Sequence, residues 1–150
     1  NKVMSLKTRF GNLGNILDFD NLTEENIYVL DSPILTNSQF KKFKKFFSKK
    51  VKVIDCTFDI DGSLKERIEL IREEAETAVR EGNTSLVLSD KNISNQKASI
   101  PSILTVGAVH SHLVKHGLRG YCSLNVECSD AMDTHSFAIL IGVGATTVNP

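Results

Sequence analysis

Residues 51–89 read VKVIDCTFDIDGSLKERIELIREEAETAVREGNTSLVLS and contain one complete strand–helix–strand unit. Residues 51–56 form a short apolar run rich in β-branched side chains, which predicts a buried strand. A helix is predicted over residues 63–81, because residues 63–66 match the S-x-x-E pattern of a capping box. Residues 84–89 are again short and apolar and predict a second strand. A helix between two strands is typical of a parallel sheet.

The same alternation continues on the C-terminal side of this unit. The further predicted elements are a helix over 101–117, a strand over 121–127, a helix over 131–141 and a strand over 145–149. The order is therefore βαβαβαβ. Units of about 30 residues that repeat in this way predict right-handed crossovers between parallel strands.

A short helix is predicted before the first strand. Thr36 and Gln39 form another capping box, and Phe40, Phe43 and Phe47 follow at helical spacing. Lysines occupy its other faces, which favours an amphipathic helix lying on the core, with contact to RNA or lipid headgroups as the alternative. Residues 1–35 show no long periodicity and are interpreted as an irregular N-terminal arm, so residues 36–150 form the central α/β domain.

One face of the predicted sheet is unusually small and polar. Strand alternation places on this face Ser85, Val87, Ser89, Ser123, Asn125, Glu127, Ala145, Thr147 and Asn149. A parallel sheet covered by helices on both faces has apolar strands on both sides, so we expect this face to lack a helix layer. An incomplete (β/α) barrel explains the pattern. An open doubly wound sheet and a half-exposed sheet remain alternatives.

Composition excludes several classes of partner. The 150 residues are 41% hydrophobic and carry 18 basic and 18 acidic side chains, so no net field draws the chain to nucleic acid or to a membrane. Three cysteines without C-x-x-C spacing argue against a disulfide framework and against a cysteine zinc site. No apolar stretch approaches the roughly 20 residues of a membrane span. We expect a cytoplasmic protein.

Polar residues at the predicted strand ends are the candidates for chemistry, since α/β enzymes place reacting groups there. They are Asp55, Asp59, Asp90, Glu127, Asp130 and Asn149. Helix capping is the alternative role of Asp59, Asp90 and Asp130. An autonomous small barrel-like enzyme would use Asp90, Glu127 and Asn149, which remains the second functional hypothesis.

The histidines and cysteines do not form a pattern typical of a metal-binding or catalytic site. His110 and His112 lie about 200 degrees apart around a helix, which argues against a shared ion, and no metal, cofactor or catalytic residue is assigned. His110 is expected to be a hydrogen-bonded core residue, whereas His112 and His116 are expected near the surface at the helix end; the role of His135 is left open. The two cysteines at 122 and 128 are expected to be buried apolar thiols.

Several segments together resemble a known family. They are SPILTN (32–37), LSD (88–90), IPSILTVGAVH (100–110) and GVGATTVNP (142–150), with MSL (4–6) and GNIL (14–17) near the start. In this order and spacing they resemble the central domain of glutamate synthase large subunits, over essentially the whole chain.

The resemblance implies a fold and a set of partners. The family's central domain is a reduced relative of its FMN-binding barrel and connects two active sites. A glutaminase domain with a cysteine nucleophile releases ammonia from glutamine, and a later barrel with FMN and an iron–sulfur cluster reduces 2-iminoglutarate to glutamate. We expect both sites, those cofactors and any small NADPH-oxidising subunit to lie outside these residues, which are then not catalytic alone. The electron donor, NADPH, NADH or ferredoxin, stays open.

The resemblance also implies one site. The family's ammonia tunnel begins at a Thr-Asn pair, which corresponds to Thr36 and Asn37 of this sequence. Thr36 is also the predicted helix cap. Where the family pattern pairs adjacent histidines, this chain has His110-Ser111-His112 and Thr134-His135-Ser136. We therefore assign no role to these histidines.

Overall fold

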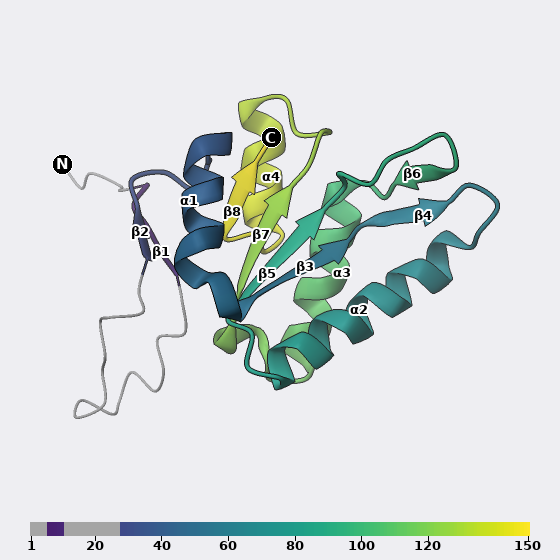
Figure 1. Cartoon of the computed structure of the whole chain (residues 1–150), viewed down its shortest axis with the longest axis horizontal. Helices are drawn as coiled ribbons and strands as arrows, with labels where there is room; N and C mark the ends of the chain where they lie inside the picture. The colour runs from purple at the N-terminus through teal and green to yellow at the C-terminus, as the bar shows by residue number, and fades with distance from the viewer. Residues whose placement is uncertain (1–5, 11–27) are drawn as a thin grey trace.

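A computed structural model of the protein describes residues 6–10 and 28–150. Its centre is a four-stranded parallel sheet of order β3-β5-β7-β8, formed by Val51–Asp55, Ser85–Ser89, Ser123–Glu127 and Thr147–Asn149 (Figure 1). The predicted α/β class and the four parallel strands are confirmed. Closure into a barrel is not seen in the described residues.

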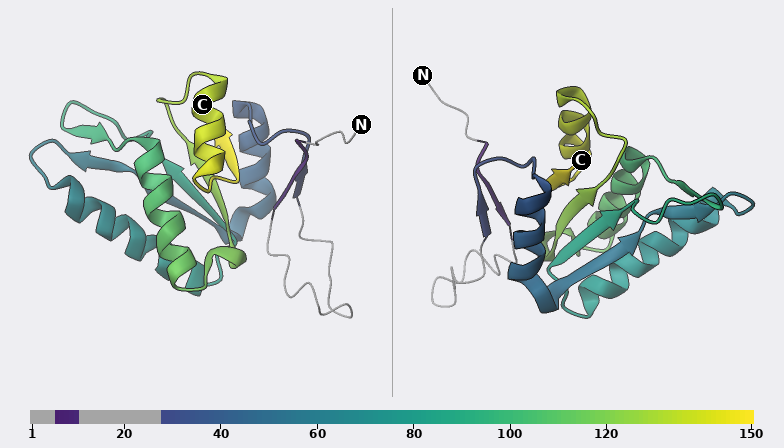
Figure 2. Two further views of the ribbon diagram at one scale, coloured as in Figure 1. Left: turned by 180° about the vertical axis from the view of Figure 1, so that it is seen from behind. Right: turned by 45° about the horizontal axis from the view of Figure 1, so that its top comes forward.

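Three helices cover one face of this sheet. They are α2 (Leu64–Arg80), α3 (Ser102–Lys115) and α4 (Thr134–Gly142), and the left view of Figure 2, from behind, shows them in front of the strands. The core between the two layers contains side chains such as Ile71 of α2, Val109 of α3 and Leu124 of β7, each completely buried. Of the capping box predicted for α2, the N-cap half is present as a bond from the Glu66 amide to Ser63 Oγ (3.3 Å), and the return bond from the Ser63 amide to the Glu66 side chain is not seen. No helix in the described part of the chain is long and apolar enough to cross a membrane.

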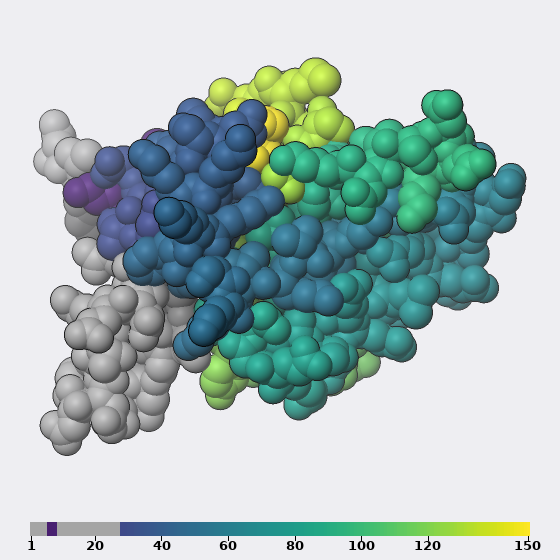
Figure 3. Space-filling view, in the orientation of Figure 1, coloured from purple at the N-terminus to yellow at the C-terminus, as the bar shows by residue number. Residues whose placement is uncertain are grey.

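The opposite face of the sheet carries α1 (Asn37–Phe47), which corrects the expectation that no helix covers it. Phe40, Phe43 and Phe47 are buried as predicted, and they cluster with Val87 of β5. In the space-filling view α1, in blue, lies over the strands (Figure 3). The polar composition of this face misled the prediction, because one aromatic helix covers the part formed by β5, β7 and β8, while Val53 of β3 on the same face stays 49% exposed.

The polar side chains beneath α1 satisfy one another. Asn125 has no exposed surface, and its amide donates to Ser85 Oγ (2.9 Å) and to the Leu86 carbonyl (3.1 Å). The Thr147 hydroxyl donates to Asn125 Oδ1 (2.7 Å). Buried polar groups are tolerated when they are hydrogen-bonded in this way. The polar face is therefore an internal network and not a half-exposed surface.

Two small antiparallel ladders were not predicted. Within the N-terminal arm, β1 (Thr8–Phe10) pairs with β2 (Tyr28–Leu30), so the described part of the arm is not irregular; the rest of the arm lies outside the described residues. β4 (Thr57–Asp59) pairs with β6 (Lys97–Ser99) beyond the ends of β3 and β5. Strands of three residues are too short to show a period of two. The short 3-10 helices η2 (Ser48–Lys50) and η3 (Arg119–Tyr121) complete the elements of the described residues.

One half-buried arginine, Arg119, joins the layers at the edge where the strands begin. Arg119 Nε donates to His110 Nδ1 (3.1 Å), and its two terminal nitrogens donate to the carbonyls of Cys122 (2.6 Å) and Gly144 (2.8 Å). Burial and the Arg119 charge lower the pKa of His110, so its imidazole is neutral and accepts this bond. The predicted hydrogen-bonded state of His110 is confirmed.

This junction explains why residue 144 is a glycine. Gly144 has φ +124°, and a Cβ there would overlap the His110 ring. We expect Gly144→Ala to lower the free energy of unfolding substantially, since backbone strain and overpacking each cost about 1–3 kcal/mol. Chemical denaturation of the chain measures the change.

Gly107→Ala is the matched control. A Cβ at this position in α3 would meet nothing within 4 Å. Alanine should therefore stabilise the helix by about 0.5–1 kcal/mol. Equal effects of the two substitutions would contradict the proposed cause.

Candidate functional site

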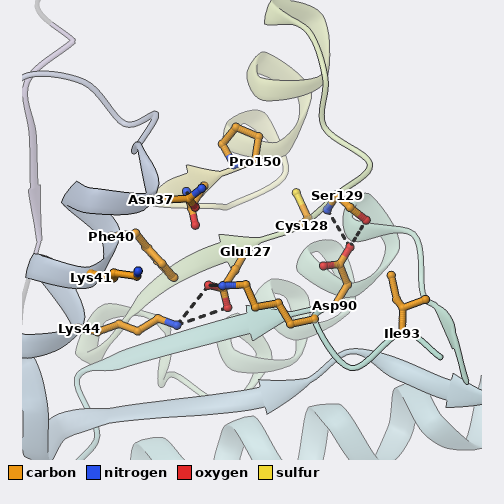
Figure 4. A pocket seen from close by; sticks show the side chains of 12 residues that line it. Asn37, Phe40, Lys41, Lys44, Asp90, Ile93, Glu127, Cys128, Ser129 and Pro150 are labelled. Atoms are coloured by element: carbon orange, nitrogen blue, oxygen red, sulfur yellow. Dashed lines mark hydrogen bonds and ion pairs between the residues drawn. The ribbon is translucent and has the colours of Figure 1, made fainter.

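A cavity of about 550 Å³ lies at the edge of the sheet where the parallel strands end (Figure 4). Its lining comes from α1, the loop after β5, the end of β7 and the end of β8. The lining residues are Asn37, Phe40, Lys41, Lys44, Asp90, Lys91, Ile93, Glu127, Cys128, Ser129, Asn149 and Pro150. Strand ends are where α/β proteins place their functional groups. This is the candidate site.

Strand register brings its polar groups together. Ser89, Glu127 and Asn149 occupy the last positions of β5, β7 and β8, and they are paired across the sheet. Their side chains lie on the same face as the Asn125 network, because they are two residues further along each strand. α1 lies over this face, so its first and second turns form the opposite wall. The site therefore forms because strands that are distant in the sequence pair side by side in the sheet.

Glu127 is the buried charge of the cavity. Its side chain is 5% exposed, and it accepts bonds from Lys44 Nζ (3.2 Å) and Ser89 Oγ (2.8 Å) and forms an ion pair with Lys91. Burial on its own would raise the pKa of Glu127, but bonds from Lys91, Ser89 and Lys44 outweigh it and hold the pKa below its ordinary value. Glu127 is an ionised acceptor and not a proton donor near neutral pH.

The other two side chains of the cavity that are considered for chemistry are Asp90 and Cys128. Neither is free to react. The Asp90 Oδ2 atom accepts from the Ser129 amide (2.8 Å) and from its hydroxyl (2.7 Å), which fixes the loop after β7. Burial and the nearby Asp130 raise the pKa of Cys128 to about 12, so the thiol stays protonated. The cavity therefore brings together Asp90, Glu127 and Asn149 as the enzyme hypothesis requires, but without an acid–base pair among them.

Two side-chain amides form the other end of the cavity. Asn149 Nδ2 donates to the Leu35 carbonyl (2.9 Å) and to Asn37 Oδ1 (3.2 Å). Asn37 lines the cavity, whereas Thr36 does not. The Thr36 hydroxyl instead accepts from the Gln39 amide, and the Thr36 amide donates to Gln39 Oε1 (2.9 Å), which confirms its predicted capping box. Thr36 therefore places Asn37 at the first position of α1.

The remaining acidic candidates lie elsewhere. Asp55 accepts from Thr57 and Asn92 beside β3, and Asp59 is exposed in β4. Capping of the following helix by Asp59, Asp90 or Asp130 is wrong, because Ser63, Pro101 and Asp133 occupy the N-caps of α2, α3 and α4. Asp130 instead accepts from the Ser102 amide (2.8 Å) at the start of α3, a helix that precedes it in sequence.

The cysteines behave as predicted. Cys56, Cys122 and Cys128 are free and buried, and the last two share the apolar face with Leu124 and Val126. Burial raises the pKa of Cys56 to about 12 and that of Cys122 to about 11, which makes both poor nucleophiles.

Sequence reasoning missed the lysines of the site. Lys44 lies 83 positions before its partner Glu127, and the lysine run of α1 gives no signal that one member points inward. Helical spacing offers a partial signal in retrospect, since Lys44 follows Phe40 by four residues and its Nζ lies 4.5 Å from that ring's centre. Only the fold shows that Glu127 is the charge partner of Lys44.

Glu127→Gln tests the electrostatic account. The variant keeps the size of the side chain but removes the charge that binds two lysines. We expect a loss of about 1.5–3 kcal/mol in the free energy of unfolding at pH 7, the usual worth of hydrogen bonds to charged groups. Because the folded-state pKa is lowered, this stabilisation is present above the unfolded pKa of about 4.3 and is lost as pH falls through the folded pKa.

Urea unfolding at pH 7 and at pH 3 measures this difference. The gap between the original chain and the variant should shrink at pH 3. Glu73→Gln, at an exposed position of α2, is the control and should change little at either pH. A gap that is independent of pH would contradict the role of the charge.

Comparison with known proteins gives one consistent answer. The family model described as the glutamate synthase central domain matches residues 1–150. The chain is 48% identical over 151 residues to the glutamate synthase [NADPH] large chain of Azospirillum brasilense. It is 37% identical over 154 residues to the chloroplastic ferredoxin-dependent glutamate synthase of Spinacia oleracea, and 37% identical over 155 residues to the glutamate synthase [NADH] of Schizosaccharomyces pombe.

These matches cover 99% of the chain but only 10%, 9% and 7% of the three relatives. The chain thus spans about a tenth or less of the length of the proteins that it resembles. The matching family model and the three relatives confirm the family that the motifs at 32–37, 100–110 and 142–150 predicted. The chain belongs to the glutamate synthase central domain family.

Proposed function

We propose that this domain links the glutaminase and synthase parts of a glutamate synthase chain and contributes the cavity beneath α1 to the path of ammonia between them. The observation that carries the proposal is the composition of this cavity. It combines two amides, Asn37 and Asn149, with a carboxylate whose charge is already neutralised.

Such a lining suits a small neutral molecule that both donates and accepts hydrogen bonds. Amide groups offer donors and acceptors without transferring protons. Glu127 is ionised and engaged by Lys44, Lys91 and Ser89, so it does not supply a proton that would convert ammonia to ammonium. The reactive side chains of the cavity are held by hydrogen bonds and ion pairs. This favours passage of ammonia through the cavity over a reaction catalysed in it.

The architecture supports a scaffold related to the family's flavin barrel. In a (β/α) barrel the helices lie outside and the strand interior faces the barrel axis. Here α2, α3 and α4 lie on one face of four parallel strands, and α1 occupies the face that would point inward. We infer an incomplete barrel over residues 36–150, preceded by the arm of residues 1–35.

Catalysis then belongs to other parts of the enzyme. We expect the glutaminase nucleophile, the FMN and the iron–sulfur cluster in the neighbouring domains of the full chain, with a small NADPH-oxidising subunit in forms that use this donor. The relatives are named for NADPH, NADH or ferredoxin, so the domain is compatible with each. A cytoplasmic location remains our expectation.

Asn37→Ala in the intact enzyme tests the ammonia path. The substitution removes the amide that pairs with Asn149 at the edge of the cavity. Loss of one hydrogen bond, about 0.5–1.5 kcal/mol, should lower by about two- to tenfold the share of ammonia that reaches the synthase site. The measurement is glutamine hydrolysed per glutamate formed from 2-iminoglutarate, which should rise.

Two variants control this experiment. Asn95→Ala makes the same chemical change at an exposed position away from the cavity and should leave the ratio unchanged. Thr36→Ser keeps the capping hydroxyl and should also be neutral, since we expect Thr36 to act by positioning Asn37. An unchanged ratio in Asn37→Ala would remove Asn37 from the path.

A further inference from the structure

A second cluster of polar side chains lies at the opposite edge of the sheet from the cavity. α2 and α3 run back along the sheet, so their last turns meet near the starts of the strands (Figures 1 and 2). Glu76 of α2 faces His112 of α3 and His116, the residue that ends α3. One ligand atom from each of the three residues lies within 4.8 Å of the others.

The two histidines share one face of the helix. Residues four apart on an α-helix are separated by about 40 degrees around its axis, whereas the His110 and His112 pair is separated by about 200 degrees. The ring centres of His112 and His116 lie 4.3 Å apart. Helix geometry therefore argues against His110 as a second ligand beside His112 and favours His116.

A single carboxylate oxygen faces both rings. Glu76 Oε2 lies 2.7 Å from His112 Nε2 and 3.8 Å from His116 Nδ1. Its other oxygen, Oε1, accepts from Arg80 Nε (2.8 Å), which fixes the orientation of the carboxylate. Ligating carboxylates in metal sites are commonly held by such an outer partner.

The hydrogen bond of His116 sets its tautomer. His116 Nδ1 lies 2.8 Å from the His112 carbonyl oxygen, which only accepts, so Nδ1 carries the hydrogen and Nε2 carries the lone pair. The nitrogen 3.8 Å from Glu76 is therefore the protonated one, and His116 binds an ion through Nε2 of the same ring. A ring nitrogen bonded to a backbone carbonyl is the usual support of a metal-ligating histidine. The cluster also lies at the C-terminal ends of two helices, where their dipoles favour a cation.

A hydrogen bond between Glu76 and His112 that joins two helices is the simpler role of this cluster. It does not account for His116, which is exposed and adds a second ring beside the same oxygen. Two imidazoles and one carboxylate are the ligand set that zinc takes when one coordination position is left to water.

We propose that Glu76, His112 and His116 bind a divalent transition-metal ion, with Zn²⁺ as the best fit to two imidazole nitrogens and one carboxylate oxygen. Binding replaces the hydrogen bond between His112 Nε2 and Glu76 Oε2, because His112 binds a metal only through a nitrogen that carries no hydrogen. The ion joins the last turns of α2 and α3. Its place at the edge where the strands begin is distant from the cavity at their ends.

Zinc binding to the intact glutamate synthase chain tests the proposal. Equilibrium dialysis against radioactive Zn²⁺ compares the original enzyme with His116→Gln, whose exposed side chain is the least needed for folding. We expect the variant to bind one zinc ion fewer per chain. We expect its residual affinity at this site to be weaker by more than about tenfold, since even outer partners of a ligand contribute about 10–100-fold.

His135→Gln is the matched control, because it removes an exposed histidine from α4, away from the cluster. It should bind as much zinc as the original enzyme, and circular dichroism should show all three proteins folded. Excess Ni²⁺ should compete for the site and excess Mg²⁺ should not, because imidazole ligands favour the former. Equal zinc binding by His116→Gln and the original enzyme, or displacement by Mg²⁺, would overturn the proposal.

Discussion

The amide of Asn125 is the constraint on which the inner side of this domain depends. It lies at the centre of the parallel sheet with no exposed surface, and its nitrogen bonds to Ser85, to Ser123 and to the Leu86 carbonyl. A buried amide without partners would cost several kcal/mol. The neighbouring strands therefore place small hydroxyl groups around it, and Thr147 donates to its oxygen.

This network explains why the two faces of one sheet pack so differently. The outer face is apolar and is covered by α2, α3 and α4, as in other α/β domains. On the inner face the hydroxyl and amide groups form hydrogen bonds with one another. The helix that lies above them therefore needs no polar groups to satisfy them. α1 therefore covers this face with phenylalanines that contact Val87, while its lysines remain mostly exposed.

The cavity arises where this arrangement ends. Beyond Asn125 and Thr147, the last residues of the strands extend past the aromatic contacts of α1, and their polar groups find new partners. Glu127 binds lysines from α1 and from the loop after β5, and Asn149 binds the segment that enters α1. Fixed charges and amides surround the space, and these groups are the basis of the proposed ammonia path.

The sequence alone determined the order of the four parallel strands and of the helices, the cap at Thr36, the buried phenylalanines and the polar inner face, because these depend on local periodicity and hydrogen bonding. The motifs in the sequence also indicated the glutamate synthase family. Only the tertiary structure decided that α1 covers the inner face, that Lys44 pairs with Glu127, and that Glu76 meets His112 and His116. Each of these contacts joins residues at least 36 positions apart, and their partners follow from strand register and helix packing, which no local pattern encodes.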